Sequence, residues 1–382
     1  MIIETCRLNS SHLQLGLPLP GDLFDENGKM LLAKGLIPNS QSQLDKLLER
    51  GLYIEISLFE ACFGRSGASS KTTVQKKFDP FQIRRTMKLS LNRLLYGAVR
   101  GSASMAQILE FAEDLQAYAE TDGEAMIAAC LLDREEESRA AAHSLSCAIL
   151  CALLAKRLDW PDACQRSVVC AALTMNLCML DLQQRLSHQA TPLAPAQLEQ
   201  VHAHPEAAVA ALQSIAVDDL LWLETVRQHH EKATGKGYPR QLATPADEGQ
   251  LLRLVDVFFA RASGRSDRPP LTPRQIVREL FVDEGQGACA ALVTAMVKML
   301  GIYPPGSFVK LASGELAVVF RRGESPSTPV VASVTNASGA PTMQPVRRDT
   351  AREAWGIVAA IVADKVSVGY DLAKLWVSNA KN

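Results

Sequence analysis

The chain has 382 residues, of which 47% are hydrophobic and 5% are aromatic. Its 40 lysines and arginines nearly balance its 41 aspartates and glutamates. The net charge therefore gives no reason to expect a nucleic acid polymer or a membrane surface as partner. The length favours two or three domains, and the hydrophobic content indicates a sizeable buried core rather than disorder.

The first 62 residues are predicted to form a small α+β unit. Asn27 and Gly28 lie in a polar turn between two apolar runs, which is a signal for a β-hairpin. A helical period over 42–49 and a strand-like run at 53–56 follow. Residues 63–80 are rich in Gly, Ser, Lys and Thr, and this composition predicts a linker.

Residues 81–303 are predicted to form an all-α bundle, because apolar residues recur there at three- or four-residue spacing. The expected helices span 82–98, 103–118, 124–133, 137–158, 163–180, 195–215, 218–229, 247–262, 273–283 and 286–300. Pro304-Pro305-Gly306 then breaks the helical pattern. The region 304–382 is predicted to be a C-terminal β/α extension with strands near 307–311, 315–321 and 330–334 and a final helix. The fold class expected from the whole pattern is mainly α.

The nine cysteines are interpreted as small buried hydrophobic residues in a reducing compartment. Five of them lie between residues 147 and 178, mostly among Ala and Leu, and no CxxC motif occurs. No signal peptide is predicted at the N-terminus, and no apolar stretch reaches the roughly 18 residues that a membrane-spanning helix needs. The expected location is the cytoplasm.

The histidines suggest a metal site. His229 and His230 are adjacent and are followed by Glu231, and His143 and His204 lie in separate predicted helices. Asp256 interrupts an apolar helix, where a carboxylate is costly to bury without a partner or a metal. Imidazole and carboxylate ligands together suit Fe, Mn or Zn. The alternative for each single residue is an ordinary half-buried histidine or an ion-paired acid.

In their order and spacing these motifs resemble the HD-GYP domain, a branch of the HD metal-dependent phosphohydrolases. The resemblance covers about residues 80–305. It rests on His143-Ser144, His204-Pro205, His229-His230-Glu231 with Gly235-Lys236-Gly237-Tyr238-Pro239, and Asp256-Val257-Phe258. It implies an HD-type helical bundle with two or three metals that hydrolyses cyclic di-GMP or related cyclic dinucleotides in bacterial signal transduction. The N-terminal unit also resembles a small unit that often precedes HD-GYP domains.

The residues that depart from the family pattern are those that carry its chemistry, so the chain resembles a degenerate HD-GYP domain. The family's His-Asp pair aligns with Met175-Asn176, and the lysine that follows aligns with Met179. In the family the aspartate bridges two metals, whereas Asn is neutral and a Met thioether suits Fe or Mn poorly. No catalytic set is therefore intact, because the motif is lost at Met175, Asn176 and Met179. The residual candidate ligands are His143, His204, His229, His230 and Asp256. The expected cofactor is none or a single divalent metal (Fe, Mn or Zn), and the family's two or three metals are not expected.

The Gly-Tyr-Pro loop of the family pattern is intact, as are the five residual candidate ligands. In relatives this loop is linked with docking of signalling proteins such as diguanylate cyclases, and a rigid aromatic side chain is a reasonable binding hot spot. The alternative is a structural turn packed on the bundle. The candidate partner or ligand loop consists of Gly235, Lys236, Gly237, Tyr238 and Pro239. Arg265 and Arg268 are weaker candidates for contact with a phosphate.

Three functions remain open from the sequence. The first is a catalytically inactive regulatory or interaction module of cyclic di-GMP signalling. The second is a divergent cyclic di-GMP phosphodiesterase that works with one metal. The third is a receptor that binds cyclic di-GMP without a metal.

Overall fold

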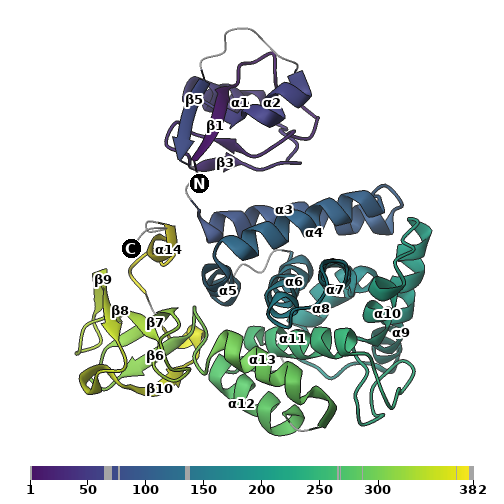
Figure 1. Ribbon diagram of the computed structural model, residues 1–382, viewed down its shortest axis with the longest axis vertical. Helices are drawn as coiled ribbons and strands as arrows, with labels where there is room; N and C mark the ends of the chain where they lie inside the picture. Colours follow the sequence, from purple (N-terminus) through teal and green to yellow (C-terminus); the bar gives the residue numbers. More distant parts are fainter. Residues whose placement is uncertain are drawn as a thin grey trace. The chain divides into compact units, whose positions relative to one another are not determined.

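The chain folds into two compact units, Met1–Ser90 with Leu372–Asn382, and Leu91–Asp371 (Figure 1). The computed structural model describes residues 2–63, 71–75, 78–133, 138–264, 266, 268–285, 287–366 and 368–377. Much of the predicted linker lies outside the described residues, so the domain boundaries at 62, 80 and 303 stay predictions.

The first unit contains a five-stranded antiparallel sheet in the order β3-β2-β4-β1-β5. Its elements are β1 (Ile2–Arg7), β2 (Leu23–Phe24), β3 (Met30–Leu32), α1 (Gln41–Glu49), β4 (Tyr53–Glu55), α2 (Ile56–Phe63) and β5 (Lys71–Gln75). The turn between β2 and β3 contains Gly28 at φ 77°, a backbone conformation that glycine adopts at little cost. Ser40 caps α1 by accepting from the backbone N–H of Gln43. Leu23, Leu52 and Ile54 are fully buried in the core of this unit.

The second unit is mostly helical, which confirms the predicted fold class. Its α-helices are the end of α3 (Pro80–Val99), α4 (Met105–Thr121), α5 (Gly123–Leu132), α6 (Arg139–Arg157), α7 (Asp162–Thr174), α8 (Leu180–His188), α9 (Pro195–Ser214), α10 (Leu220–Gln228), α11 (Asp247–Ser263), α12 (Pro273–Glu284) and α13 (Ala290–Leu300).

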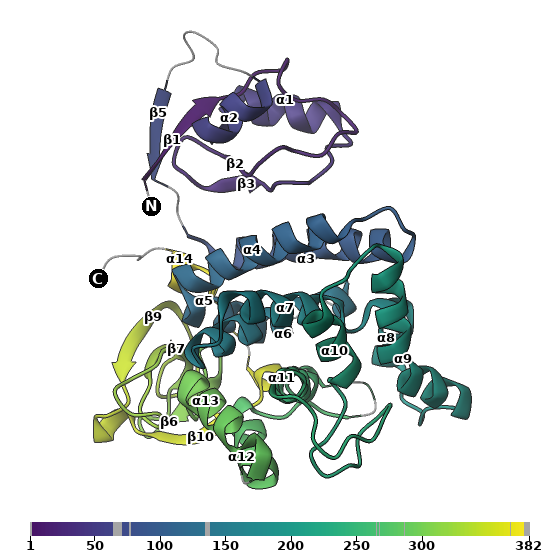
Figure 2. The same ribbon diagram turned by 45° about the vertical axis from the view of Figure 1, so that its right-hand side comes forward.

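Helix α6 is central to this unit. It contacts α4, α5, α7, α8, α11 and α13, and it lies between α4 and α11 in both views (Figure 1, Figure 2). Its Ala, Cys and Ser side chains are small, so neighbouring helices can approach closely on all sides. The stretches Arg139–Arg157 and Asp162–His188 are long and apolar enough to pass a test for membrane spans, but 72% of each tested window is buried within the fold. Their hydropathy is that of core helices.

One helix boundary was predicted wrongly. The sequence pattern predicts a single helix over 163–180, whereas α7 ends at Thr174 and a 3-10 turn, η1 (Leu177–Met179), leads into α8. The break occurs at Asn176, whose φ of −103° and ψ of 18° leave the helical range. Leu180, Leu182 and Leu186 bury the inner face of α8, so the apolar residues there belong to a separate short helix.

The end of the second unit is a five-stranded antiparallel sheet in the order β10-β6-β7-β8-β9. Its strands are β6 (Phe308–Leu311), β7 (Leu316–Arg321), β8 (Val330–Thr335), β9 (Pro341–Asp349) and β10 (Ile357–Ile361). Two short 3-10 turns, η3 (Glu353–Trp355) and η4 (Ala363–Lys365), flank β10. The final helix is described as α14 (Lys374–Val377), which belongs to the first unit. Arg321 at the end of β7 donates to both carboxylate oxygens of Asp122, each at 2.6 Å, which ties this sheet to the start of α5.

Candidate metal centre

Four parts of the second unit bring the five predicted ligands together. His143 lies in the first turns of α6, His204 in the middle of α9, His229 and His230 directly after α10, and Asp256 in α11. Their ligand atoms form two groups, His204–His229–His230 and His143–Cys147–Asp256, and within each group the three atoms lie within 4.8 Å of one another. We refer to these as the histidine group and the mixed group.

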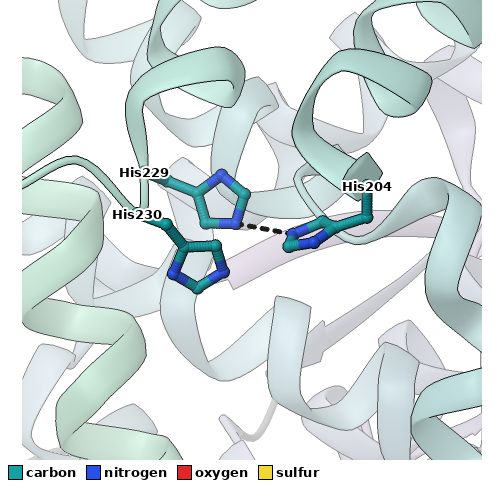
Figure 3. A group of neighbouring side chains, drawn as sticks. All are labelled: His204, His229 and His230. Atoms are coloured by element: carbon teal, nitrogen blue, oxygen red, sulfur yellow. Dashed lines mark hydrogen bonds between the residues drawn. The ribbon is translucent and has the colours of Figure 1, made fainter. Parts of the chain in front are cut away.

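In the histidine group the three imidazoles turn toward one another (Figure 3). The Nδ1 atom of His204 lies 2.5 Å from the carbonyl oxygen of Val201, and that of His229 lies 2.6 Å from the carbonyl oxygen of Val226. Each Nδ1 must therefore carry a proton and donate it, which leaves the Nε2 atom as an acceptor with a lone pair. A histidine that ligates a metal through one nitrogen commonly donates its other N–H in this way.

The two Nε2 atoms of His204 and His229 are 3.1 Å apart. With both Nδ1 atoms protonated, two lone pairs face each other across this distance, and a cation between or beside them relieves the repulsion. Burial lowers the pKa of His204 to about 3, with the nearby His229 as the next cause. Burial also lowers the pKa of His229 and of His230. At neutral pH these imidazoles therefore do not bind a proton that would relieve the repulsion between the two Nε2 lone pairs. The neutral imidazoles are available to a metal ion.

In the mixed group, Nε2 of His143 lies 2.7 Å from Oδ1 of Asp256. Burial tends to raise the pKa of Asp256, but the hydrogen bond and charge of His143 outweigh it, so the pKa is lowered and the carboxylate stays ionised. The Sγ atom of Cys147 lies 3.6 Å from the same Nε2. Cys147 lies in a run of small apolar residues, so the sequence pattern did not indicate it as a candidate ligand. Its spacing of four residues from His143, which places both on one helix face, was the available signal.

Met175, Asn176 and Met179 have uncharged side chains at the positions where the family pattern has His, Asp and Lys. Met175 directly follows α7 as its C-cap and is fully buried, and Asn176 is 6% exposed. Met179 packs with Leu182 and Leu186 of α8 and with Val201 of α9, one turn before His204. At the position where the family pattern has a lysine, the local packing is therefore hydrophobic.

Glu231 is fully buried and acts on the backbone of the loop that follows it. Its carboxylate accepts hydrogen bonds from the backbone N–H groups of Arg240, Gln241 and Leu242 at 2.6, 3.1 and 3.0 Å. Its main-chain carbonyl accepts from the Gln250 side chain at 2.9 Å. This carboxylate is thus already satisfied by three donors, and its position in the motif is explained by closure of the loop.

The Gly-Tyr-Pro loop packs against the histidine group. The Tyr238 ring stacks on His230 with centroids 4.6 Å apart, and it also lies 4.6 Å from the ring of His202. Gly237 has no room for a side chain, because a Cβ there would lie 2.4 Å from the Cα of Glu231. Gly235 has φ 70°, Lys236 is exposed, and the bond from Tyr238 to Pro239 is cis. The Tyr238 ring is thus half-buried, with one face against the histidines.

The two arginines after α11 that could contact a phosphate stay predictions. Arg265 lies outside the described residues. Arg268 donates to the carbonyl oxygen of Ala260 at 3.1 Å, which ties the segment back onto its own helix.

Comparison with known proteins gives the family context. Residues 125–286 match the sequence model of the HD domain family. Over 192 residues the chain is 28% identical to the cyclic di-GMP phosphodiesterase PA4108 of Pseudomonas aeruginosa, a match that covers 50% of this chain and 46% of that protein. The chain thus spans about half the length of this curated relative. Among solved structures it is similar to Bd1817, an HD-GYP-type protein from Bdellovibrio bacteriovorus, with 15% identity, a TM-score of 0.46, and coverage of 78% of this chain and 99% of that one.

Residues 125–286 therefore match an HD domain, and this part of the chain is similar to a cyclic di-GMP phosphodiesterase. HD domains bind divalent metals, and the two donor groups are the places in the described part of this domain where such an ion would find ligands.

Proposed function

Because residues 125–286 form an HD domain of the HD-GYP type, we propose that this protein acts in cyclic di-GMP signalling as a regulatory or interaction module that does not hydrolyse the nucleotide. The observation that carries the proposal is the pair Met175-Asn176, which stands where the family has the metal-bridging His-Asp pair and offers no charge. Both residues are buried at the end of α7.

The donor atoms fit one divalent ion and do not fit a hydrolytic pair of ions. Two divalent cations about 3.5–4 Å apart need a bridging anion to offset their mutual repulsion. Asp256 is the single carboxylate in the two described donor groups, and it is already bonded to His143. Glu231 cannot serve instead, because three backbone N–H groups occupy its oxygens. The neutral, oriented imidazoles of His204 and His229 do fit a single ion.

A single bound ion would supply positive charge that can bind a phosphate or hold the fold together. The chain's own residues would keep the ion in place through the histidines and Asp256, and the Glu231 contacts would hold the Gly-Tyr-Pro loop against His230. Without a second ion, the described donor set would lack the pair of ions that holds a bridging hydroxide in line with phosphorus in the two-metal mechanism. Loss of that function costs about 4 kcal/mol of transition-state stabilisation, or roughly a thousandfold in rate.

We further propose the Gly-Tyr-Pro loop as the surface that meets a signalling protein such as a diguanylate cyclase. Lys232, Lys236 and Arg240 are exposed around it, so the loop carries positive charge that suits an acidic partner. Since Tyr238 stacks on His230, a change in the metal centre would be felt directly in this loop.

The proposal is tested by incubating the pure protein, loaded separately with Fe²⁺, Mn²⁺ and Zn²⁺, with cyclic di-GMP and with its linear dinucleotide. We expect no hydrolysis of either compound, and calorimetric titration is expected to show binding of cyclic di-GMP. Sustained turnover above the rate of the same metals without protein would overturn the proposal.

The second candidate is a divergent phosphodiesterase that works with one metal. It is favoured by the presence of two groups of three donor atoms, which together offer more ligands than one structural ion needs. In that case His230→Ala would abolish metal binding and hydrolysis together. An exposed histidine far from the donor groups in sequence, His188, provides the control, because His188→Ala should leave both unchanged.

A further inference from the structure

We propose that Cys147 is a thiolate ligand, and that His143, Cys147 and Asp256 hold one zinc ion. The inference rests on the part of the proposed function that concerns a single bound ion, and it does not depend on the absence of hydrolysis.

The mixed group offers three ligand atoms within 4.8 Å of one another, and the distance between its sulfur and nitrogen atoms matches a tetrahedral zinc site. Zinc–sulfur and zinc–nitrogen bonds of about 2.3 and 2.0–2.1 Å place the two ligand atoms about 3.5 Å apart in a tetrahedron. The Sγ of Cys147 and the Nε2 of His143 are 3.6 Å apart. The Asp256 oxygen is closer to Nε2, at 2.7 Å, because it is hydrogen-bonded to it, so this pair would open by several tenths of an ångström around an ion.

Two helices hold these atoms in place. His143 and Cys147 are one turn apart on α6, and the contact of α6 with α11 brings Asp256 to the same point. Cys147 is fully buried, and the side chains of His143 and Asp256 are only 10% and 13% exposed. A site built on packed helices keeps its ligand positions better than one built on a loop.

Charge decides in favour of the mixed group over the histidine group. A divalent ion in a buried site is stable only where nearby anions compensate its charge. One thiolate and one carboxylate neutralise a divalent cation completely, whereas three neutral imidazoles leave both charges uncompensated. The mixed group therefore provides the anions, and a histidine of the neighbouring group or a water molecule completes the fourth position.

The thiolate also selects the metal. Sulfur ligands favour zinc over the harder ions Mn²⁺ and Mg²⁺, and a site with N, S and O ligands is typical of zinc. With Cys147 as a ligand, the centre departs from a site for Fe or Mn held by nitrogen and oxygen alone.

The experiment is X-ray absorption at the zinc edge on the full chain loaded with one equivalent of Zn²⁺, followed by the near-ultraviolet spectrum of the Co²⁺-loaded protein. We expect one sulfur neighbour per zinc at about 2.3 Å and a sulfur-to-cobalt charge-transfer band. Cys147→Ser should lose both signals. Cys170→Ser is the matched control, because Cys170 is equally buried in α7 but lies outside both donor groups, and it should keep both signals.

Different results overturn the thiolate ligand, the single bound ion and the regulatory function. A zinc shell of nitrogen and oxygen only in the wild-type chain overturns the inference, and so does a sulfur signal that survives in Cys147→Ser. Since the wild-type spectrum is decisive, the test stands even where Cys147→Ser fails to fold. Failure of the chain to bind zinc also overturns the inference, and failure to bind Fe²⁺ and Mn²⁺ as well refutes the single-ion proposal itself. Hydrolysis of cyclic di-GMP refutes the regulatory function while leaving Cys147 as a ligand.

Discussion

Of the two carboxylates near the histidines, Glu231 is fully buried and the Asp256 side chain is 13% exposed, and they have different roles because they have different partners. Asp256 faces one imidazole and keeps free lone pairs, so it remains available to a cation. Glu231 accepts three backbone N–H groups and closes the loop that carries Tyr238. The adjacent pair His230-Glu231 thus combines a candidate metal ligand with a structural residue.

The role of Glu231 gives the first prediction. Glu231→Gln replaces an oxygen that accepts hydrogen bonds with an N–H₂ group that cannot, which leaves at least one buried backbone N–H without a partner. We expect the free energy of unfolding to fall by about 1.5–3 kcal/mol, measured by urea denaturation. Glu199→Gln on the exposed face of α9 is the control and should leave stability unchanged. Equal stability of both variants would show that the loop is held by other contacts.

At the residue scale the sequence predicted which residues are candidate ligands better than it predicted which side chains lie next to them. The motif pattern predicted His143, His204, His229, His230 and Asp256, and the structure brings them together. The role of these five as metal ligands stays a prediction. Cys147 was interpreted as a core residue, since a sequence of small apolar residues does not reveal which side chain points at a histidine. The sequence also left open whether the Tyr238 loop is a binding surface or a turn packed on the bundle, and in the structure one face of the Tyr238 ring lies on His230.

At the scale of elements, the proposed absence of hydrolysis rests on the segment from α7 to α8. The sequence pattern merges it into one helix, because the apolar spacing continues across Met175 and Asn176. The structure breaks the chain there and gives Met179 a hydrophobic neighbourhood beside α9. Periodicity cannot reveal such a break, since the residues on both sides are equally apolar.

This segment supports a gain-of-function prediction. The double substitution Met175→His with Asn176→Asp adds an imidazole and a bridging carboxylate at the end of α7. We expect the number of tightly bound divalent ions to rise from one to two per chain, since the added anion compensates the second ion. Met175→Leu with Asn176→Ala is the control that adds no ligand. If the double variant keeps a native circular dichroism spectrum but binds no additional metal, the segment does not face the donor groups.

The C-terminal sheet depends on a buried carboxylate. Glu315 accepts hydrogen bonds from Arg348 at 2.9 and 3.2 Å and from Ser313 and Ser333, and these bonds lower its pKa in the folded chain. A pKa that is lower in the folded state contributes stability above the unfolded pKa, and this contribution is lost as the pH falls through the folded pKa.

We therefore expect acidification below about pH 4.3, the ordinary pKa of glutamate, to lower the melting temperature of the wild-type chain. Glu315→Gln should be less stable at pH 7 and should lose less stability between pH 7 and acid. The measurement is thermal unfolding by circular dichroism across this range. A pH dependence identical in both proteins would contradict a role for Glu315.

At the scale of the whole molecule, the metal and the fold are linked by mass action. An ion that binds the folded chain only, at a free concentration of 100 times its dissociation constant, stabilises it by about 2.7 kcal/mol. For a domain of this size the melting temperature should then rise by roughly 5–10 °C. We predict that a chelator lowers the melting temperature by this amount and that added Zn²⁺ restores it. A melting temperature that does not respond would mean that the donor atoms are satisfied by one another alone.

The organisation of the whole chain was predicted in outline. The helical region, the strands at both ends and the HD family all follow from motifs and periodicity, which are local properties of the sequence. The order of strands in the two sheets and the packing of α6 among six other helices do not follow, because they depend on contacts between distant residues. The function of the whole chain depends on a metal count that neither periodicity nor packing provides.

The most direct test of the account is therefore the metal content of the full chain, purified without exposure to oxygen and measured by elemental mass spectrometry. The account predicts one divalent ion per chain, with zinc as the preferred metal. Two or more iron or manganese ions per chain would contradict it, since the described donor groups would then hold the pair of ions that hydrolysis needs.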